Sequence, residues 1–314
     1  MGPANANVDP ILVEVAERYS TAIGADWLII GTTTERDAWR QSLAVRMTRG
    51  ITMDLELTGK VAIVPASSGG LGKAVALALG REGARVAMCS RDETAIEAAA
   101  AEVRVSGAEV LALAADVTQA ADIERLIAAT IERFGGVDIL VTNAGGPPAG
   151  TFDRFEDDAW QAAFNLTLMS VVRLIRGVLP SMKERGGGAI VAMTSSSIKQ
   201  PIPNLLLSNV MRSGVAALIK SLADEVASDH IRLNTVVPGR IATARIAQLD
   251  QANAEKQGVD VETVRNRSLA QIPMGRYGEA AEFADMVAFL TSERASYITG
   301  ATVQIDGGMI RSLW

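Results

Sequence analysis

Residues 60–73 read KVAIVPASSGGLGK, and this stretch decides how the chain folds. The apolar run 61–64 is rich in β-branched residues, which is typical of a buried parallel strand. A turn with three glycines follows, and the apolar residues over 74–79 predict a helix directly after it. Backbone N–H groups and the positive end of that helix both face the turn, so the stretch predicts an anion site.

The glycines of this turn favour a pyrophosphate as the anion. A Cβ at Gly70 or Gly72 would keep a pyrophosphate from approaching the backbone. A glycine cluster alone would also fit an ordinary loop between a strand and a helix. The order of strand, turn and helix favours the phosphate site over that alternative.

Composition limits the class of protein. The chain has 314 residues, of which 48% are hydrophobic and only 4% are aromatic. An aliphatic core of this kind suits helices packed on a parallel sheet. The net charge of −6, without a long basic block, argues against a nucleic acid as partner. No apolar run approaches the roughly 20 residues that a membrane span requires.

Cys89 and His230 are the only residues of their types. Neither an internal disulfide nor a multi-histidine metal site is therefore expected, and a single cysteine fits a reducing compartment. His230 directly precedes a predicted strand, where we expect a structural role. These features predict a soluble, cytoplasmic protein without a metal.

Residues 1–52 do not share the pattern of the rest of the chain. Asp9 and Pro10 suggest the start of a helix, and no signal-peptide pattern is present. The segment is a helix packed on the domain or on a partner subunit, a poorly ordered tail, or the result of an upstream start codon. We favour a loosely attached or partly disordered extension over 1–52, followed by a domain over 53–314 that Met53 would open naturally.

From residue 53 onward, predicted strands and helices alternate. Strands are expected at 60–65, 84–90, 108–115, 137–142, 188–194, 231–237 and 301–306. Helices are expected at 70–82, 92–106, 119–135, 156–184, 206–228 and 279–291. The alternation predicts an α/β fold, a Rossmann-type doubly wound parallel sheet of about seven strands with helices on both faces. Ligands of such sheets bind beyond the carboxyl ends of the strands, so the residues there are the candidates for a site.

The second predicted strand ends at Ser90-Arg91-Asp92. Arg91 beside Ser90 suits the 2′-phosphate of NADP(H), whereas a carboxylate such as Asp92 would bind the ribose hydroxyls of NAD(H). The charge pattern favours NADP(H) over NAD(H). Alternatively, Asp92 caps the next helix and Arg91 is a solvated surface charge.

Two further strand ends carry polar residues. The third strand leads into Asp116 and Val117, and the fourth leads into Asn143, Ala144 and Gly145. Small residues after an asparagine let the backbone pass close under a flat ligand, while the amide bonds neighbouring main chain. A simple turn would have the same sequence.

From about residue 53 to 308, the chain resembles the short-chain dehydrogenase/reductase family, in particular the branch of 3-oxoacyl-[acyl-carrier-protein] reductases. The matching motifs are the glycine turn 65–72, Asn143-Ala144-Gly145, Asn165, Ser195, Pro238-Gly239 with Thr243, and the terminal segment 303–308. Each motif is weak alone, but they follow the family's order and spacing.

The resemblance implies a set of cofactor contacts. These are Ser67, Ser68, Gly70, Leu71 and Gly72 for the pyrophosphate and the adenosine ribose, Asp116 and Val117 beside the adenine, Asn143, Ala144 and Gly145 along the cofactor, and Pro238, Gly239, Ile241 and Thr243 near the nicotinamide. The stretch 244–274, which shows no regular pattern, occupies the place of the family's substrate lid.

The family's catalytic pattern is changed in this chain. The family uses Tyr-x-x-x-Lys on one helix, preceded by a serine, and an asparagine completes its proton relay. Ser195 and Asn165 match, but Ser208 stands at the tyrosine position and Arg212 at the lysine position. Hydride addition to a carbonyl leaves an alkoxide, which needs a proton donor in reach. The usual acid is therefore missing.

The substituted residues cover only part of the lost chemistry. Arg212 can hold ribose hydroxyls and its charge can stabilise an alkoxide, but it cannot donate a proton at neutral pH. The Ser208 hydroxyl is a far weaker acid than a phenol. Loss of a matched general acid lowers a rate on the order of 10² to 10⁴. Lys199 either supplies a proton through water or is merely solvated.

The glycine turn also departs from the family's pattern TGxxxGxG. Ala66 replaces the first glycine, and alanine accepts only a negative φ without strain. Pro65 replaces the threonine and has no N–H to offer the sheet. We expect weaker nucleotide binding or a slightly reshaped turn.

Two functions remain open. The first is an NADP(H)-dependent oxidoreductase that interconverts a carbonyl and an alcohol, on a 3-oxoacyl thioester or a related small ketone, with an atypical proton donor. The second is a catalytically silent dinucleotide-binding protein that acts as a sensor, a scaffold or a partner subunit. The retained Ser195 and Asn165 favour the enzyme. By resemblance, the long helices 156–184 and 206–228 pair across subunits, which implies a homodimer or homotetramer.

Overall fold

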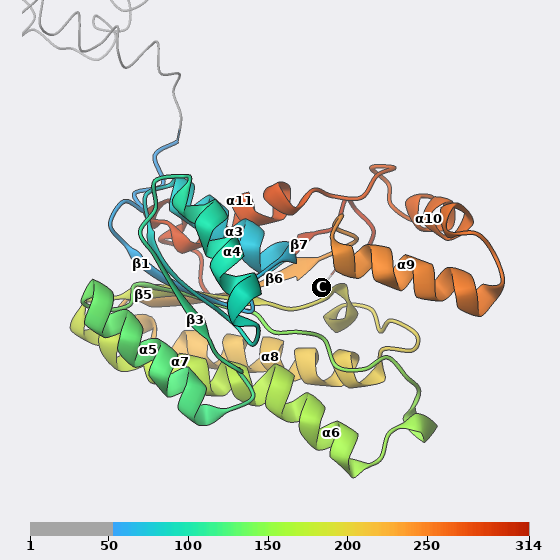
Figure 1. Cartoon of the computed structure of the whole chain (residues 1–314), viewed down its shortest axis with the longest axis horizontal. Coiled ribbons are helices and arrows are strands. Elements are labelled where there is room, and N and C mark those ends of the chain that lie inside the picture. Colours follow the sequence, from blue (N-terminus) through green and yellow to red (C-terminus); the bar gives the residue numbers. More distant parts are fainter. Residues whose placement is uncertain (1–52, 314) are drawn as a thin grey trace, which may run out of the picture. The chain divides into compact units, whose positions relative to one another are not determined.

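The computed structural model describes residues 53–313, and its compact unit begins at Leu55. The extension predicted over 1–52 lies outside the described residues. Within the described part, one parallel sheet carries helices on both of its faces (Figure 1).

The sheet has seven strands in the order β3-β2-β1-β4-β5-β6-β7, and all neighbouring strands are parallel. The strands are β1 Val61–Pro65, β2 Arg85–Ser90, β3 Val110–Ala114, β4 Ile139–Thr142, β5 Gly188–Met193, β6 Ile231–Pro238 and β7 Thr302–Ile305. The strand order reverses between β1 and β4, which is where such sheets bind ligands. The doubly wound fold predicted from the sequence is confirmed.

Helices lie at each of the predicted positions, and two further helices, α9 and α10, were not predicted. They are α3 Gly70–Arg81, α4 Glu93–Arg104, α5 Ala120–Phe134, α6 Asp157–Ala163, α7 Ser170–Glu184, α8 Leu206–Glu225, α9 Ala244–Gln257, α10 Val261–Leu269 and α11 Ala280–Thr291. Short 3-10 helices are η2 Phe152–Arg154, η4 Ser196–Ile198, η5 Ala227–Asp229 and η6 Glu293–Ala295, and η3 Phe164–Met169 is a π-helix.

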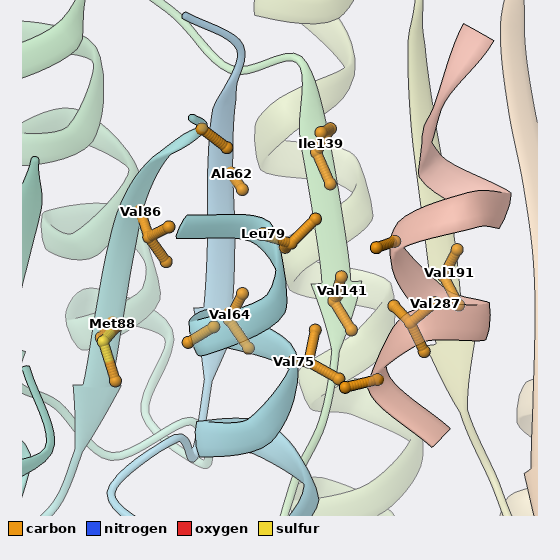
Figure 2. Packing of buried hydrophobic residues seen from close by; sticks show 14 of the residues in the cluster. Ala62, Val64, Val75, Leu79, Val86, Met88, Ile139, Val141, Val191 and Val287 are labelled. Carbon is orange, nitrogen blue, oxygen red and sulfur yellow. The ribbon is translucent and has the colours of Figure 1, made fainter. Parts of the chain in front are cut away.

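Alternate residues of each strand face two different helix layers. Ala62 and Val64 of β1 pack under α3, α4 and α11, whereas Ile63 packs on the side of α5, α7 and α8. Figure 2 shows the first layer, where side chains of α3 and α11 lie over β1, β2, β4 and β5. Burial on both faces explains why the strands are continuous apolar runs in the sequence.

The helical stretch Asp157–Glu184 is 28 residues long, and its mean hydropathy reaches 1.5. By length and composition alone it could cross a membrane, although the sequence predicts no such segment. Leu174, Val178 and Met182 of α7 are buried in the layer with α5 and α8. An apolar stripe packed on a sheet is typical of a core helix in a globular domain.

The expectation of a stretch without regular structure at 244–274 is wrong, because α9 and α10 occupy most of it. Both helices begin at capping side chains: Thr243 accepts from the N–H of Ile246, and Asp260 accepts from that of Thr263. Most of their other side chains are exposed. The stretch therefore lacks the apolar periodicity from which a helix is predicted.

Candidate active site

The β1–α3 turn contains an alanine whose backbone adopts a conformation that favours glycine. Ala66 has a φ of +49°, in the left-handed region that favours glycine, and Gly70 has a φ of +55°. Pro65 still pairs with Cys89 of β2 in the parallel register. The surrounding contacts therefore hold Ala66 in a conformation that glycine would adopt without strain.

Gly72 and Asn143 fasten the turn to the end of β4. The Asn143 side-chain amide donates to the carbonyls of Ala66 and Pro65 at 3.0 and 3.3 Å. A Cβ on Gly72 would lie 2.6 Å from the Ala66 oxygen and 2.7 Å from Asn143 Nδ2. Only glycine fits there without displacing backbone, whereas a Cβ at Gly70 would meet nothing within 4 Å. Because Gly70 and Gly72 have no Cβ, the turn is open enough to fit a dinucleotide pyrophosphate.

Ser67 supports the turn from inside. Its side chain is fully buried, its hydroxyl donates to the Val64 carbonyl at 2.7 Å, and its N–H donates to the Cys89 carbonyl at 3.1 Å. Its donors are therefore engaged within the protein. Ser68 and Leu71 are half-buried and remain the residues of this segment, with Gly70, that can face a ligand.

The structure at the end of β2 decides between the two roles that the sequence allows for Asp92. The Asp92 carboxylate accepts from the N–H of Ala95 at 2.9 Å and so caps α4, while Ser90 donates to the Asp92 carbonyl at 2.8 Å. Arg91 is exposed, and within the described residues it forms no ion pair or hydrogen bond. A free guanidinium at this strand end fits a 2′-phosphate.

The end of β3 is a rigid turn. The Asp116 carboxylate accepts from the N–H of Thr118 at 2.9 Å, and the N–H of Asp116 donates to Asp122 at 2.8 Å. Val117 is buried beneath this turn. Its backbone is fixed by contacts within the protein before any ligand is bound.

Ser195, Ser208 and Arg212 come together at the end of β5. Arg212 Nε donates to Ser208 Oγ at 3.3 Å, and Nη1 donates to the carbonyls of Met193 and Thr194 at 3.2 and 3.3 Å. These two carbonyls immediately precede Ser195, whose hydroxyl accepts from the N–H of Ser197 at 3.2 Å. Arg212 thus holds the end of the strand that presents Ser195.

Arg212 has no carboxylate partner within the described residues. Desolvation lowers the pKa of its guanidinium to about 10, so the side chain stays cationic at neutral pH. Nη2 donates to nothing in the described part of the chain. A half-buried cation with free donors is suited to hold a negatively charged oxygen.

Asn165 lies in the π-helix η3, which packs against α8. Single π turns inside α-helices occur frequently at functional sites. Asn165 and Lys199 are both half-buried. The Lys199 ammonium group, just after η4, forms no hydrogen bond or ion pair within the described residues. Asn165 therefore lies in an element that packs against α8, the helix that carries Ser208 and Arg212.

The segment after β6 joins the sheet to α9. Gly239 packs so tightly on Asp306 that a Cβ would lie 2.6 Å from its Cα, and Pro238 ends the strand. Ile241 is buried and pairs with Gly278. Thr243 then starts α9 as its cap. Ala144 and Gly145 follow Asn143 at the end of β4, which is separated from β6 by β5, and nothing lies within 4 Å of a Cβ placed on Gly145.

The buried Asp250 of α9 is the centre of a polar network that the sequence did not indicate. Asp250 of α9 is only 4% exposed; it pairs with Arg240 at 2.5 Å and accepts from the Tyr277 hydroxyl at 2.9 Å. Arg240 and Arg265 of α10 each lie 5.9 Å from the centre of the Tyr277 ring. The network connects α9 and α10 to the segment after β6. Only long-range contacts reveal it.

Other candidate features lie elsewhere. No group of three or more His, Cys, Asp or Glu side chains in residues 53–313 is arranged to hold a metal ion. A groove of about 310 Å³ runs between α5 and α7 and is lined by none of the predicted site residues. His230 has a φ of +57° at the end of η5, a structural role in a turn.

The reversed strand order, the glycine turn and the polar strand ends define a Rossmann-type dinucleotide-binding protein. A family model described as enoyl-(acyl carrier protein) reductase matches residues 65–310. The chain belongs to the short-chain dehydrogenase/reductase family of oxidoreductases.

Several known proteins resemble the chain over most of its length. Dehydrogenase/reductase SDR family member 4 of Oryctolagus cuniculus is 35% identical over 260 residues, 82% of this chain and 96% of that protein. A putative ketoacyl reductase of Streptomyces coelicolor is 34% identical over 252 residues, 80% of this chain and 97% of that relative.

Solved structures give the same picture. The L-sorbose reductase of Gluconobacter frateurii, complexed with NADPH and L-sorbose, has a TM-score of 0.80 and 34% identity, covering 83% of this chain and 100% of that one. The actinorhodin polyketide ketoreductase with NADPH has a TM-score of 0.78 and 34% identity, covering 81% of this chain and 98% of that one.

Proposed function

We propose that the protein is an NADP(H)-dependent oxidoreductase that interconverts a carbonyl and an alcohol. The observation that carries this proposal is the Arg212 guanidinium, which lies beside Ser208 and the strand end that presents Ser195 without a carboxylate to neutralise it. Its hydrogen-bond partners are uncharged, so no opposite charge offsets the cost of removing the guanidinium from water. It gains a partner when a negatively charged oxygen forms next to it.

NADP(H) is the proposed cofactor, and when bound it supplies the hydride. The turn at Gly70 and Gly72 would hold its pyrophosphate, the free Arg91 would hold its 2′-phosphate, and Thr243 would meet its nicotinamide. The NADPH-bound reductases that the chain resembles support this choice. Replacing Arg91 by alanine should lower NADPH affinity about tenfold and leave NADH affinity unchanged.

The chain's own residues act on the substrate oxygen. Ser195 and Ser208 hydroxyls can each donate a hydrogen bond to it, and the free Nη2 donors of Arg212 stabilise its negative charge. None of these groups is a strong acid, so the proton has an atypical source. We propose a 3-oxoacyl thioester or a related small ketone as substrate, which the similarity to a putative ketoacyl reductase supports.

The alternative is a dinucleotide-binding protein without catalysis, acting as a sensor, scaffold or partner subunit. The replaced tyrosine position at Ser208 and the alanine at a glycine position in the turn favour it. It predicts nucleotide binding of ordinary strength together with no turnover.

Steady-state oxidation of NADPH over a panel of ketones and 3-oxoacyl thioesters separates the two functions. The matched control is Ser195→Ala, which removes one donor to the substrate oxygen and leaves the nucleotide contacts in place. Turnover that falls on the order of 10² to 10³ in the control supports the enzyme. Calorimetric NADPH binding without turnover above the control would leave only the silent protein.

We also propose a homodimer or homotetramer that pairs the surfaces of α7 and α8. Both helices have apolar faces, and Val210 of α8 is 46% exposed in the single chain. Sedimentation equilibrium of the full chain tests this, and a single species of 33.0 kDa would contradict it.

A further inference from the structure

Arg245 is the second residue of α9, and its charge has no partner in the described part of the chain. The side chain is exposed, and its guanidinium forms no hydrogen bond or ion pair with residues 53–313. Arg240, five positions earlier, is paired with Asp250 and lies against the Tyr277 ring. Of the two arginines that follow β6, Arg245 is therefore the one whose donors are available to a ligand.

The stability of α9 does not explain an arginine at this position. The first turn is the positive end of the helix dipole, where acidic residues stabilise a helix and cations oppose it. α9 has no acidic residue in its first turn, whereas α10 begins with Asp260 and Glu262. Arg245 adds a positive charge where the helix is already positive, so we look for its role outside the helix.

The Arg245 side chain reaches from one strand end toward another. It follows β6, yet its Nη2 atom lies 3.8 Å from where a Cβ on Gly146 would be, and Gly146 belongs to the segment after β4. β5 lies between β4 and β6 in the sheet. A guanidinium that spans these two segments therefore crosses the carboxyl edge of the sheet at β5, the strand that leads into Ser195.

The protein itself fixes the start of α9. Thr243 caps the helix by accepting from the N–H of Ile246, and Asp250 in the same helix is held by Arg240 and Tyr277. The backbone that carries Arg245 is thus in place before a ligand binds. Only the side chain itself has to be ordered, which limits the entropy cost of a contact with substrate.

We propose that Arg245 binds a carboxylate of the substrate, so that the ketone reduced by this protein is an oxo acid. The inference rests on the proposed function and narrows its substrate class. A guanidinium can form two parallel hydrogen bonds to a carboxylate, which makes arginine a selective partner for this group. Arg212 then acts on the oxygen that becomes negative in the reaction, and Arg245 on oxygens that are negative throughout.

The place of Arg245 limits the length of this acid. Neighbouring strands lie about 4.8 Å apart, so the ends of β4 and β6 are separated by about 10 Å. A carboxylate bound between them lies only a few bonds from a carbonyl that faces Ser195. The phosphates of a coenzyme A thioester are at the far end of a long arm. The geometry therefore favours a compact oxo acid over a thioester.

The kinetic test compares oxo acids of increasing length with their methyl esters, using NADPH. Wild type should prefer the acid at least tenfold in kcat/KM, and Arg245→Met should lower kcat/KM for the acid about ten- to a hundredfold without changing that for the ester. Arg245→Lys keeps the charge and should retain part of the preference. Lys256→Met, at the exposed other end of α9, is the matched control and should change neither substrate.

Equal losses for acid and ester in Arg245→Met would overturn the proposal, because the residue would then only position α9. A 3-oxoacyl thioester of coenzyme A, compared with the neutral thioester of N-acetylcysteamine, tests the other source of an anion. A preference for the coenzyme A form that disappears in Arg245→Met would assign the contact to phosphate and overturn the oxo acid.

A binding measurement keeps the inference separate from the proposed function. With NADP⁺ bound, a ketone cannot be reduced, so calorimetry gives its Kd without turnover. Wild type should bind the acid at least tenfold more tightly than the ester, and added salt should weaken this preference because Arg245 is exposed. Equal Kd values would overturn the role of Arg245. If no ketone is turned over, the proposed function fails, whereas a preference for the acid would still support the carboxylate contact.

Discussion

The turn after β1 and the segment from β5 into α8 both depart from the family's pattern, with different consequences. In the turn, Ala66 adopts a left-handed φ of +49°, a conformation that glycine adopts without strain, and Asn143 donates to its carbonyl. Between β5 and α8, the backbone is also in place, but Ser208 cannot supply what a phenol supplies. Binding through backbone geometry tolerates a changed side chain, whereas proton transfer depends on the side chain itself.

Two half-buried arginines differ in how their charge is compensated. Arg232 donates to the carbonyls of Leu290 and Ser292 at 2.8 and 2.9 Å, and the charge of Glu293 lies near enough to oppose its loss of pKa by burial. Arg212 also donates to carbonyls, but no carboxylate affects its pKa. A structural arginine has its charge compensated by the fold. Arg212 keeps its charge available to a ligand.

The largest expected effect is at Arg212. Arg212→Met should lower kcat/KM on the order of 10² to 10³, because the cation that stabilises the reacting oxygen is lost. The Kd for NADPH should change only a few-fold, since the turn and Arg91 hold the nucleotide. Arg212→Lys is the matched control and should keep most of the activity. Equal losses of affinity and activity in Arg212→Met would place its main role in nucleotide binding.

The second-largest effect is expected at Asp250 of α9. Asp250→Asn removes the charge that pairs with Arg240 and the strong acceptor of Tyr277. Hydrogen exchange of the amides in α9 and α10 should become about ten to a hundred times faster, because local opening of these helices no longer breaks charged hydrogen bonds. Glu255→Gln, on the exposed side of the same helix, is the control. Unchanged exchange in Asp250→Asn would show that α9 and α10 are held by other contacts.

Sequence and structure agree where local pattern decides. The strands follow from continuous apolar runs, and Asp92 was already a candidate cap because capping is local. Helices α9 and α10 were not predicted, because hydrophilic helices give no periodic apolar signal. The contact of Asp250 with Tyr277 was not predicted either, because the two residues are 27 positions apart in the sequence and meet only in the fold. Motif spacing named Ser195, Ser208 and Arg212 as candidates, but it did not predict the contacts of Arg212 with Met193 and Thr194.

A smaller effect is expected in the turn. Gly72→Ala places a methyl group against the Ala66 carbonyl and the Asn143 amide, which is expected to lower NADPH affinity about tenfold and the unfolding free energy by about 1–3 kcal/mol. Gly69→Ala is the control, because its φ is −170° and nothing lies within 4 Å of the added methyl. Calorimetric titration and chemical denaturation measure the two quantities. Equal behaviour of the two variants would show that the Gly72 contact is not limiting.

The smallest effect is expected at Ala66. Ala66→Gly relieves a left-handed φ but also makes the unfolded chain more flexible, so the unfolding free energy should rise by no more than about 1 kcal/mol. NADPH affinity should stay the same or rise slightly, because the turn already has its binding shape. A large gain in affinity would mean that the alanine distorts the turn more than its φ indicates.

The pH dependence of kcat/KM tests most directly whether the catalytic end works through a permanent cation rather than a phenolic acid. Arg212 must be protonated to act, and burial lowers the pKa of its guanidinium only to about 10, while burial raises the pKa of the Cys89 thiol to about 11. The profile for ketone reduction should therefore be level from about pH 6 to 9 and fall as the pH rises through about 10. A loss of activity centred well below pH 9, retained in Arg212→Lys, would contradict this account.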